Sequence, residues 1–154
     1  MNYHFILEGD HYQFYIEDEQ CHVDTSHIWE NDTKSLGVVS AHGLIGITTA
    51  RFGGTLPVTL EVYSTCPQIE YELWERVVQC SIEVLSGSLV IWSPENDWST
   101  APRIMLEKRT YSILVCFDKV NSIQDEFAFT GEDTYHLMFW PGIYMPPTLI
   151  YKRL

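Results

Sequence analysis

The segment 103-RIMLEKRTYSILVCFDKVNSIQDEFAFTGEDTYHLMFWP-141 decides the fold of this chain, because it contains two apolar strand patterns in succession. In Tyr111–Phe117, β-branched and aromatic residues alternate with other residues, and this period of two is typical of a strand. The run Tyr135–Trp140 is rich in aromatic residues and precedes Pro141, which cannot donate a hydrogen bond to a neighbouring strand. A shorter apolar run, Ile104–Leu106, comes first. We interpret the segment as the closing strands of an antiparallel β-sandwich.

The chain before this segment shows further strand patterns. Six runs combine alternation with β-branched and aromatic residues: His11–Ile16, Cys21–Val23, Gly37–Ala50, Leu56–Val62, Trp74–Leu85 and Leu89–Trp92. The third run fits two short strands or one bulged strand, since glycines within strands often mark bulges. The tight turn Ser86–Ser88 between the last two runs favours a β-hairpin. The polar stretch Asp24–Asp32 predicts a loop, with one helical turn capped by Thr25 or Ser26.

Together these patterns predict an all-β fold, an antiparallel, jelly-roll-like sandwich of two sheets with about eight or nine strands and little helix. We expect a single domain over residues 1–154, because this length can bury a core without disulfides or metals. From about residue 141, three prolines predict an extended tail that crosses the sandwich or pairs with an edge strand: Pro141, Pro146 and Pro147.

The sequence shows no signal for a membrane or for secretion. No apolar run approaches the roughly 20 residues that cross a bilayer, and the first residues lack the basic and apolar regions of a signal peptide. We therefore expect a cytoplasmic protein. The four cysteines contain no Cys-x-x-Cys pair, and Cys80 and Cys116 lie in strand patterns. Free thiols in such positions usually act as small buried apolar groups.

The chain is strongly acidic. It has 21 Asp and Glu against 9 Lys and Arg, a net charge of −12. This charge opposes direct binding to nucleic acid or to anionic membranes, because both require a cationic surface. Eight carboxylates and no Lys or Arg lie between Met1 and Thr33. This region fits either a solvated acidic face or a surface that attracts a basic protein partner, such as a nuclease or a toxin.

For the second interpretation, the candidate partner-binding residues are the carboxylates Glu17, Asp18, Glu19, Asp24, Glu30 and Asp32. Two tryptophans, Trp29 and Trp98, lie in polar loops, where an exposed indole often anchors an interface. We add both tryptophans to the candidate site.

The sequence gives little sign of catalysis. It lacks the nucleophile elbow G-x-S-x-G, a phosphate loop, the zinc motif H-E-x-x-H and a calcium loop. His22 and Asp24 would share one face of a strand and could bind zinc together with His27 or His11, but histidines beside acidic residues are common on surfaces. We therefore expect no catalytic residue, no metal and no cofactor.

Two alternatives to a binding protein remain open. One is a small-molecule-binding protein or enzyme with a pocket at the mouth of the sandwich, in which His22, Asp24, His42 and His136 would act. The other is a structural subunit of a larger assembly, which the tail and the many aromatic residues would suit.

The order of segments resembles the competence protein J family. The likeness lies in the aromatic strand His11–Ile16, the small-residue stretch Gly37–Thr48, the paired runs Val77–Leu85 and Leu89–Trp92, the Ile104–Leu106 and Tyr111–Leu114 runs, and the terminal Asp133–Tyr135. It covers most of Tyr12–Trp140 as a pattern of strands and turns. The family's best-known member is a small acidic inhibitor of a DNA-entry nuclease, so the resemblance implies a bacterial β-sandwich that inhibits a nuclease. It implies no functional residue.

Overall fold

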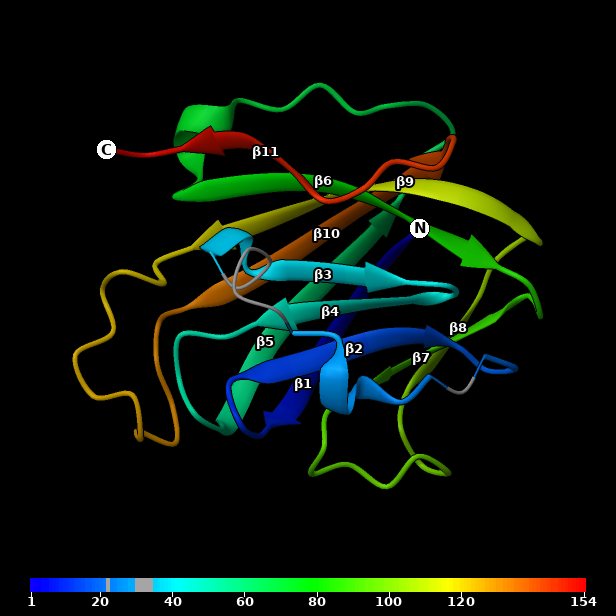
Figure 1. Cartoon of the computed structure of the whole chain (residues 1–154). Helices are drawn as coiled ribbons and strands as arrows, with labels where there is room; N and C mark the ends of the chain where they lie inside the picture. Colours follow the sequence, from blue (N-terminus) through cyan, green and yellow to red (C-terminus); the bar gives the residue numbers. More distant parts are fainter. Residues whose placement is uncertain (22, 30–34) are drawn as a thin grey trace.

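The computed structural model describes residues 1–21, 23–29 and 35–154, which form two β-sheets packed against each other (Figure 1). The six-stranded sheet has the order β1 (Asn2–Gly9), β5 (Gly54–Val62), β10 (Thr134–Pro141), β9 (Arg109–Asp118), β6 (Arg76–Val84) and β11 (Thr148–Lys152). The five-stranded sheet has the order β3 (Val38–Ala41), β4 (Leu44–Thr48), β2 (Gln13–Asp18), β7 (Ser88–Trp92) and β8 (Arg103–Met105). The predicted all-β, two-sheet fold with little helix is confirmed.

The number and direction of the strands differ from the prediction. The described residues contain eleven strands, whereas about eight or nine were expected. The additional strands include β1 and β11 at the two edges of the six-stranded sheet, while Cys21 and Val23 lie outside any strand. In addition, β5 and β10 run parallel, with Val58 opposite Tyr135. A period of two identifies a strand but carries no information on its direction.

The predicted hairpin of the β6 and β7 segments is wrong, because these strands belong to different sheets. β6 pairs with β9 and β11, and β7 pairs with β2 and β8. The chain crosses between the sheets at Leu85–Gly87. Asp18 at the end of β2 holds this crossing, since its Oδ2 accepts hydrogen bonds from the backbone N–H of Leu85 at 2.7 Å and of Ser86 at 2.9 Å.

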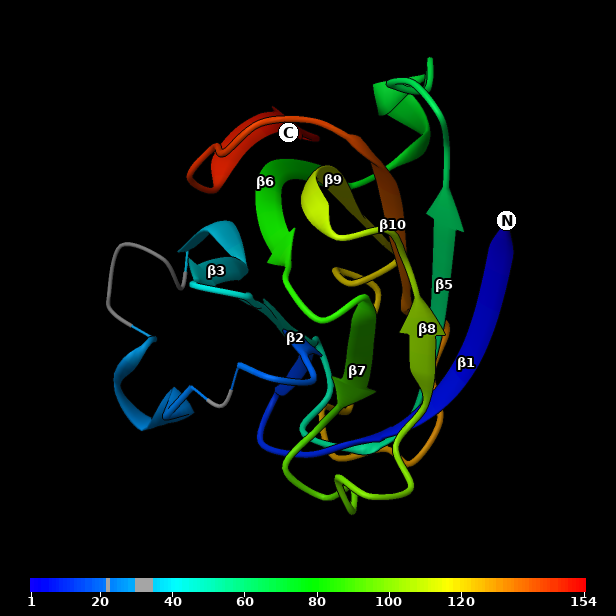
Figure 2. The ribbon, with the colours of Figure 1, turned by 90° about the vertical axis from the view of Figure 1, so that its right-hand side faces the viewer.

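The main core lies between the sheets. Figure 2 shows the two sheets as layers seen from the side. Inward-facing residues of both sheets form one buried cluster, for example Phe14 and Ile45 with Phe117 and Leu137. A second, smaller cluster lies on the outer face of the six-stranded sheet, around Leu114. The C-terminal segment covers part of this face, and β11 pairs with β6.

Two short 3₁₀ helices, η1 (Thr25–His27) and η2 (Tyr71–Leu73), interrupt the loops. The first confirms the expected helical turn, but its cap is Asp24, whose Oδ1 accepts a hydrogen bond from Ser26 N at 3.0 Å. The prediction of Thr25 or Ser26 as the cap was one or two residues too late. Within the part of the chain that the structure describes, no helix has the length and apolar character of a membrane span.

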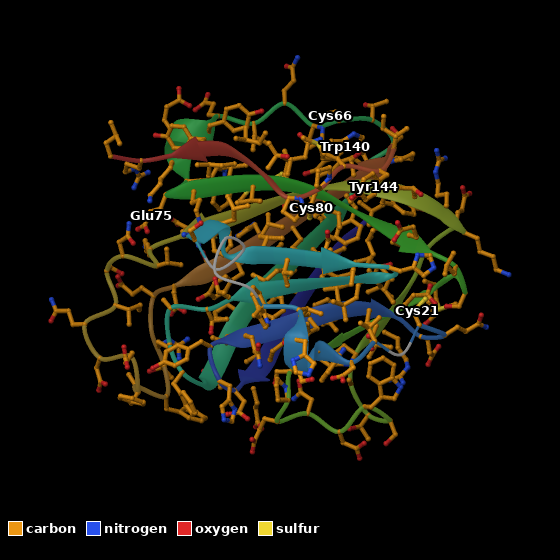
Figure 3. All side chains as sticks on the ribbon, in the orientation of Figure 1. Cys21, Cys66, Glu75, Cys80, Trp140 and Tyr144 are labelled. Atoms are coloured by element: carbon orange, nitrogen blue, oxygen red, sulfur yellow. The ribbon has the colours of Figure 1, made fainter. Side chains whose placement is uncertain are left out.

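The four cysteines are free thiols in different surroundings. Figure 3 labels Cys21, Cys66 and Cys80. Cys80 and Cys116 are buried, as predicted, and burial raises the pKa of each thiol to about 12. Cys66 is exposed.

Because thiolates are the reactive form, we expect a thiol reagent at neutral pH to modify Cys66 in the native protein and Cys80 and Cys116 only after denaturation. A Cys66→Ser variant should lose the modification that the native wild-type protein shows at Cys66. Rapid modification of Cys80 in the native state would contradict this burial.

Candidate protein-interaction surface

Two of the predicted partner-binding carboxylates lie inside the protein. Glu17 and Asp18 are fully buried. Glu17 Oε2 accepts a hydrogen bond from Val23 N at 3.2 Å. Asp18 accepts hydrogen bonds from the backbone N–H groups of Gln20, Leu85 and Ser86. Burial opposes ionisation of Asp18, but its backbone hydrogen bonds outweigh that effect and lower its pKa. Both side chains therefore stabilise the fold and offer no surface for a partner.

Glu19 is exposed, but its charge is already paired. Its Oε1 lies 2.6 Å from Nε of Arg103, and this partner lowers the pKa of Glu19. The Arg103 guanidinium also donates to the carbonyl oxygen of Trp98 at 2.9 Å and lies 5.8 Å from the centre of its ring. The structure therefore brings Glu19 and Trp98 together through Arg103.

The two candidate tryptophans belong to an aromatic row along the outer face of the five-stranded sheet. Trp29 donates from Nε1 to the Tyr15 hydroxyl at 2.9 Å, Tyr15 stacks on Trp92 at 4.9 Å, and Trp92 meets Trp98 edge-on at 5.7 Å. Both Trp29 and Trp98 are half-buried. They pack on the sheet over much of their surface and expose only part of each ring.

Of the remaining candidates in the first third of the chain, Asp24 is exposed. Its hydrogen bonds with Ser26 lower its pKa, so it is ionised at neutral pH. Glu30 and Asp32 lie outside the described residues.

Of the histidines considered for a pocket, the two that the structure describes, His42 and His136, lie on different sheets. His42 is exposed at the turn between β3 and β4. His136 lies on the outer face of the six-stranded sheet, 4.8 Å from the Trp74 ring and 3.9 Å from Glu61, and its pKa is lowered by burial. His22 lies outside the described residues. Among residues 1–21, 23–29 and 35–154, no three His, Cys, Asp or Glu side chains are arranged to hold a metal.

An open hollow of about 720 Å³ lies at one end of the sandwich. Its lining is mainly apolar and includes Met1, Tyr63, Leu106 and Tyr111, with Glu107 and Lys108 as its charged members. Neither His42 nor His136 lines it. It offers space for a ligand, but its described lining brings together no general base with an orienting partner.

A different region, absent from the sequence-based prediction, combines order with exposed aromatic rings. It is the long loop 119–133 between β9 and β10, which lies beside the turn before β5 (Figure 1). The fully buried Arg51 fastens the loop to that turn. Its Nε lies 2.8 Å from Oδ1 of Asp133, and its other nitrogens donate to carbonyl oxygens on both segments, including that of Phe129 at 2.9 Å and that of Thr55 at 2.6 Å.

Two neighbouring interactions complete this attachment. The second carboxylate oxygen of Asp133 accepts a hydrogen bond from the Tyr135 hydroxyl at 2.7 Å, and that hydroxyl accepts from Ala50 N at 2.8 Å. Gly54 has φ = +82°, and a Cβ there would collide with the carbonyl oxygen of Phe129. Only glycine therefore allows the loop to approach so closely.

The loop presents its two phenylalanines to solvent. Phe127 is 71% exposed and Phe129 is 65% exposed. They join other rings at this end of the protein: Phe127 lies 5.9 Å from Phe52, which contacts His11 at 5.0 Å and Tyr12 at 5.2 Å. We call these five residues, His11, Tyr12, Phe52, Phe127 and Phe129, the aromatic patch.

Carboxylates surround the aromatic patch. Glu126 accepts a hydrogen bond from the Tyr12 hydroxyl at 2.6 Å, which raises the pKa of that tyrosine, and Asp10 lies 2.8 Å from His11. The lining of a hollow of about 270 Å³ beside Phe52 and Phe129 includes Asp10 and two further acidic residues, Glu8 and Glu95. The sequence feature that could have predicted this surface is the run Asp125–Phe129, in which two phenylalanines follow two carboxylates in a segment between strands.

The fold places this chain among the acidic, two-sheet β-sandwich proteins. Its aromatic patch lies on loops, and its aromatic row lies on the outer face of the five-stranded sheet. No protein-family model and no curated protein sequence matches this chain. Two solved structures share its fold. One is ComJ from Bacillus subtilis, described as an inhibitor of the DNA-degrading activity of NucA, with 15% identity, a TM-score of 0.64, and coverage of 92% of this chain and 98% of ComJ.

The other is described as crocagin biosynthetic gene J, with 17% identity, a TM-score of 0.65, and coverage of 92% of this chain and 97% of that protein. The expected resemblance to the competence protein J family is therefore confirmed at the level of the fold. At this identity the likeness extends to the arrangement of strands and leaves the binding residues open.

Proposed function

We propose that this chain is a non-catalytic inhibitor or immunity-type protein that masks a basic protein partner, such as a nuclease or a toxin, in the bacterial cytoplasm. The observation that carries the proposal is the fold shared with ComJ over 92% of the chain, together with the net charge of −12. A nuclease needs a cationic surface to hold the phosphates of its substrate. An acidic β-sandwich complements such a surface.

The carboxylates of the first third would act mainly on the rate of encounter. Charges at the rim of an interface steer association, and salt screens them beyond about 10 Å. Asp24 is exposed and ionised, and Glu30 and Asp32 add two charges nearby in the sequence. Trp29 and Trp98 would contribute the exposed parts of their rings, and Glu19 would contribute less because Arg103 neutralises it.

The experiment that tests the proposal uses the protein as bait in lysate of the source organism at low and at high salt. We expect one basic protein, identified by mass spectrometry, to be retained at low salt and lost or weakened at high salt. Retention of no basic protein at low salt would contradict the proposal.

The charge-reversal variant Asp24→Lys/Glu30→Lys/Asp32→Lys tests the steering. We expect the purified partner to associate at least about tenfold more slowly with this variant, because steering accounts for factors of that size or larger. The matched control Glu70→Lys/Glu72→Lys/Glu107→Lys has the same net charge, with the changes at exposed positions elsewhere in the chain. Equal association rates for the two variants would show that steering depends on the net charge of the protein and not on the position of the carboxylates in the first third.

A second candidate function rests on the apolar hollow of about 720 Å³, whose size suits a small molecule. A ligand there would raise the melting temperature of the wild-type protein in a thermal-shift screen. The effect should disappear when Leu106→Glu places a charge in the lining. A screen with no stabilising ligand would count against this candidate.

A further inference from the structure

We infer that the aromatic patch anchors the partner, and that an arginine or lysine of the partner inserts beside Phe52 and Phe129, where Glu8, Asp10 and Glu95 neutralise its charge. This inference rests on the proposed function and names the surface and the recognition chemistry. The aromatic patch would determine how slowly the complex dissociates, and the carboxylates of the first third would determine how fast it forms.

The exposure of Phe127 and Phe129 is the first observation. Each ring leaves about two thirds of its surface in water, at 71% and 65% exposure, although burying a phenylalanine contributes about 1.5–3 kcal/mol. The neighbouring rings extend this apolar area across three segments of the chain through Phe52. Adjoining exposed aromatic rings are the usual composition of an interface centre.

The second observation is that the loop is held in place before any partner arrives. Arg51 and Asp133 fasten one side of the loop, and Phe52 N donates to the carbonyl oxygen of Glu126 at 2.7 Å on the other. Within the loop, Asp125 accepts a hydrogen bond from Phe127 N at 3.0 Å. A loop ordered in this way avoids part of the entropy cost of binding, which favours its use as an anchor.

Backbone strain at the same place is a third observation. His11 and Tyr12 have φ values of +55° and +62°, in the left-handed region that side chains other than glycine seldom adopt. This conformation lets both rings contact Phe52, and the Tyr12 hydroxyl reaches Glu126. Strained residues of this kind concentrate at functional sites.

The chemistry of the lining selects the ligand. Aromatic faces attract cations, and a guanidinium can stack on a ring while it donates two hydrogen bonds to a carboxylate. The hollow of about 270 Å³ offers both groups together, with Phe52 and Phe129 as rings and three carboxylates around them. A basic side chain fits this lining, whereas the carboxylates would repel an acidic one.

Two variants test the inference with the purified partner from the salt-dependent capture. Phe127→Ser/Phe129→Ser changes only exposed rings, and we expect it to weaken affinity about 30-fold or more, mainly through faster dissociation. Glu8→Gln/Glu95→Gln should weaken affinity and also reduce its dependence on salt, because it removes charges that face the inserted cation. The control Ile143→Ser/Tyr144→Ser removes an equally exposed apolar pair from the segment over the six-stranded sheet, at 82% and 68% exposure (Figure 3).

We expect the control to bind as the wild type does. Wild-type affinity in Phe127→Ser/Phe129→Ser would overturn the inference and leave the proposed function standing. Equal losses in this variant and in the control would also overturn it, since any exposed apolar pair would then serve. If the wild-type protein retains no basic partner at low salt, the proposed function fails, and this inference fails with it.

Discussion

Replacement of Asp133 by alanine is expected to destabilise the protein by about 3–5 kcal/mol, the usual cost of removing one partner of a buried ion pair. Asp133 and Arg51 are both fully buried, and the Nε–Oδ1 distance is 2.8 Å. Without the carboxylate, the guanidinium keeps its charge in the interior and has only carbonyl oxygens as partners. Urea denaturation measures the loss, which is a large fraction of the total of roughly 5–15 kcal/mol for a domain.

Glu132→Ala is the matched control, because it changes the net charge equally at the adjacent, exposed position. We expect it to leave the denaturation midpoint nearly unchanged. A similarly small effect of Asp133→Ala would show that Arg51 does not depend on this carboxylate. Asp133→Ala also tests whether the ordered loop 119–133 contributes to binding. Release of this loop should weaken partner binding even where the protein remains folded.

Replacement of Asp18 by alanine is expected to cost about 3 kcal/mol, because it leaves the donors at the crossing between the sheets without their charged acceptor. Asp18 accepts from Leu85 N, Ser86 N and Gln20 N at 2.7, 2.9 and 3.0 Å. The neighbouring Glu19→Ala is the control, and we expect it to change the midpoint little, since its pairing with Arg103 is at the surface.

The cost of Asp18→Ala should depend on pH. The folded state lowers the pKa of Asp18 from its ordinary value of 3.8, so the folded protein binds its proton less readily than the unfolded chain does. The stability contributed by the carboxylate is therefore fully present above about pH 4, and it is lost as pH falls through the folded-state pKa. Denaturation curves at pH 7 and at lower pH should show the difference between wild type and variant shrinking. A difference that is constant with pH would contradict this role.

The fold could be predicted from the sequence because alternate residues of many strands face the main core. Runs such as Leu56–Val62 and Tyr111–Phe117 have one face in the main core, and this leaves a period of two in the sequence. The pairing of strands leaves no such trace. The crossing at Leu85–Gly87 resembles a hairpin turn in its sequence, whereas in the structure the distant Asp18 accepts hydrogen bonds from the N–H groups of Leu85 and Ser86.

The candidate site was harder to predict, since side-chain type alone does not reveal burial. Glu17 and Asp18 contribute to the charge of the first third, yet both lie inside the protein, because β2 is the central strand of its sheet. Trp29 and Trp98 lie in polar loops but pack against Tyr15 and Trp92. The loop that carries Phe127 and Phe129 is held by hydrogen bonds from Arg51, which is more than 70 residues away in the sequence.

The central claim, that this protein masks a basic nuclease or toxin, is tested most directly on the partner's own activity. The captured protein is purified, its degradation of nucleic acid or its toxicity is measured, and wild-type protein is titrated into the assay at low and at high salt. We predict that the activity falls to near zero at an equimolar ratio at low salt, and that inhibition weakens at high salt and in Phe127→Ser/Phe129→Ser. Full partner activity in the presence of excess bound protein would contradict the claim.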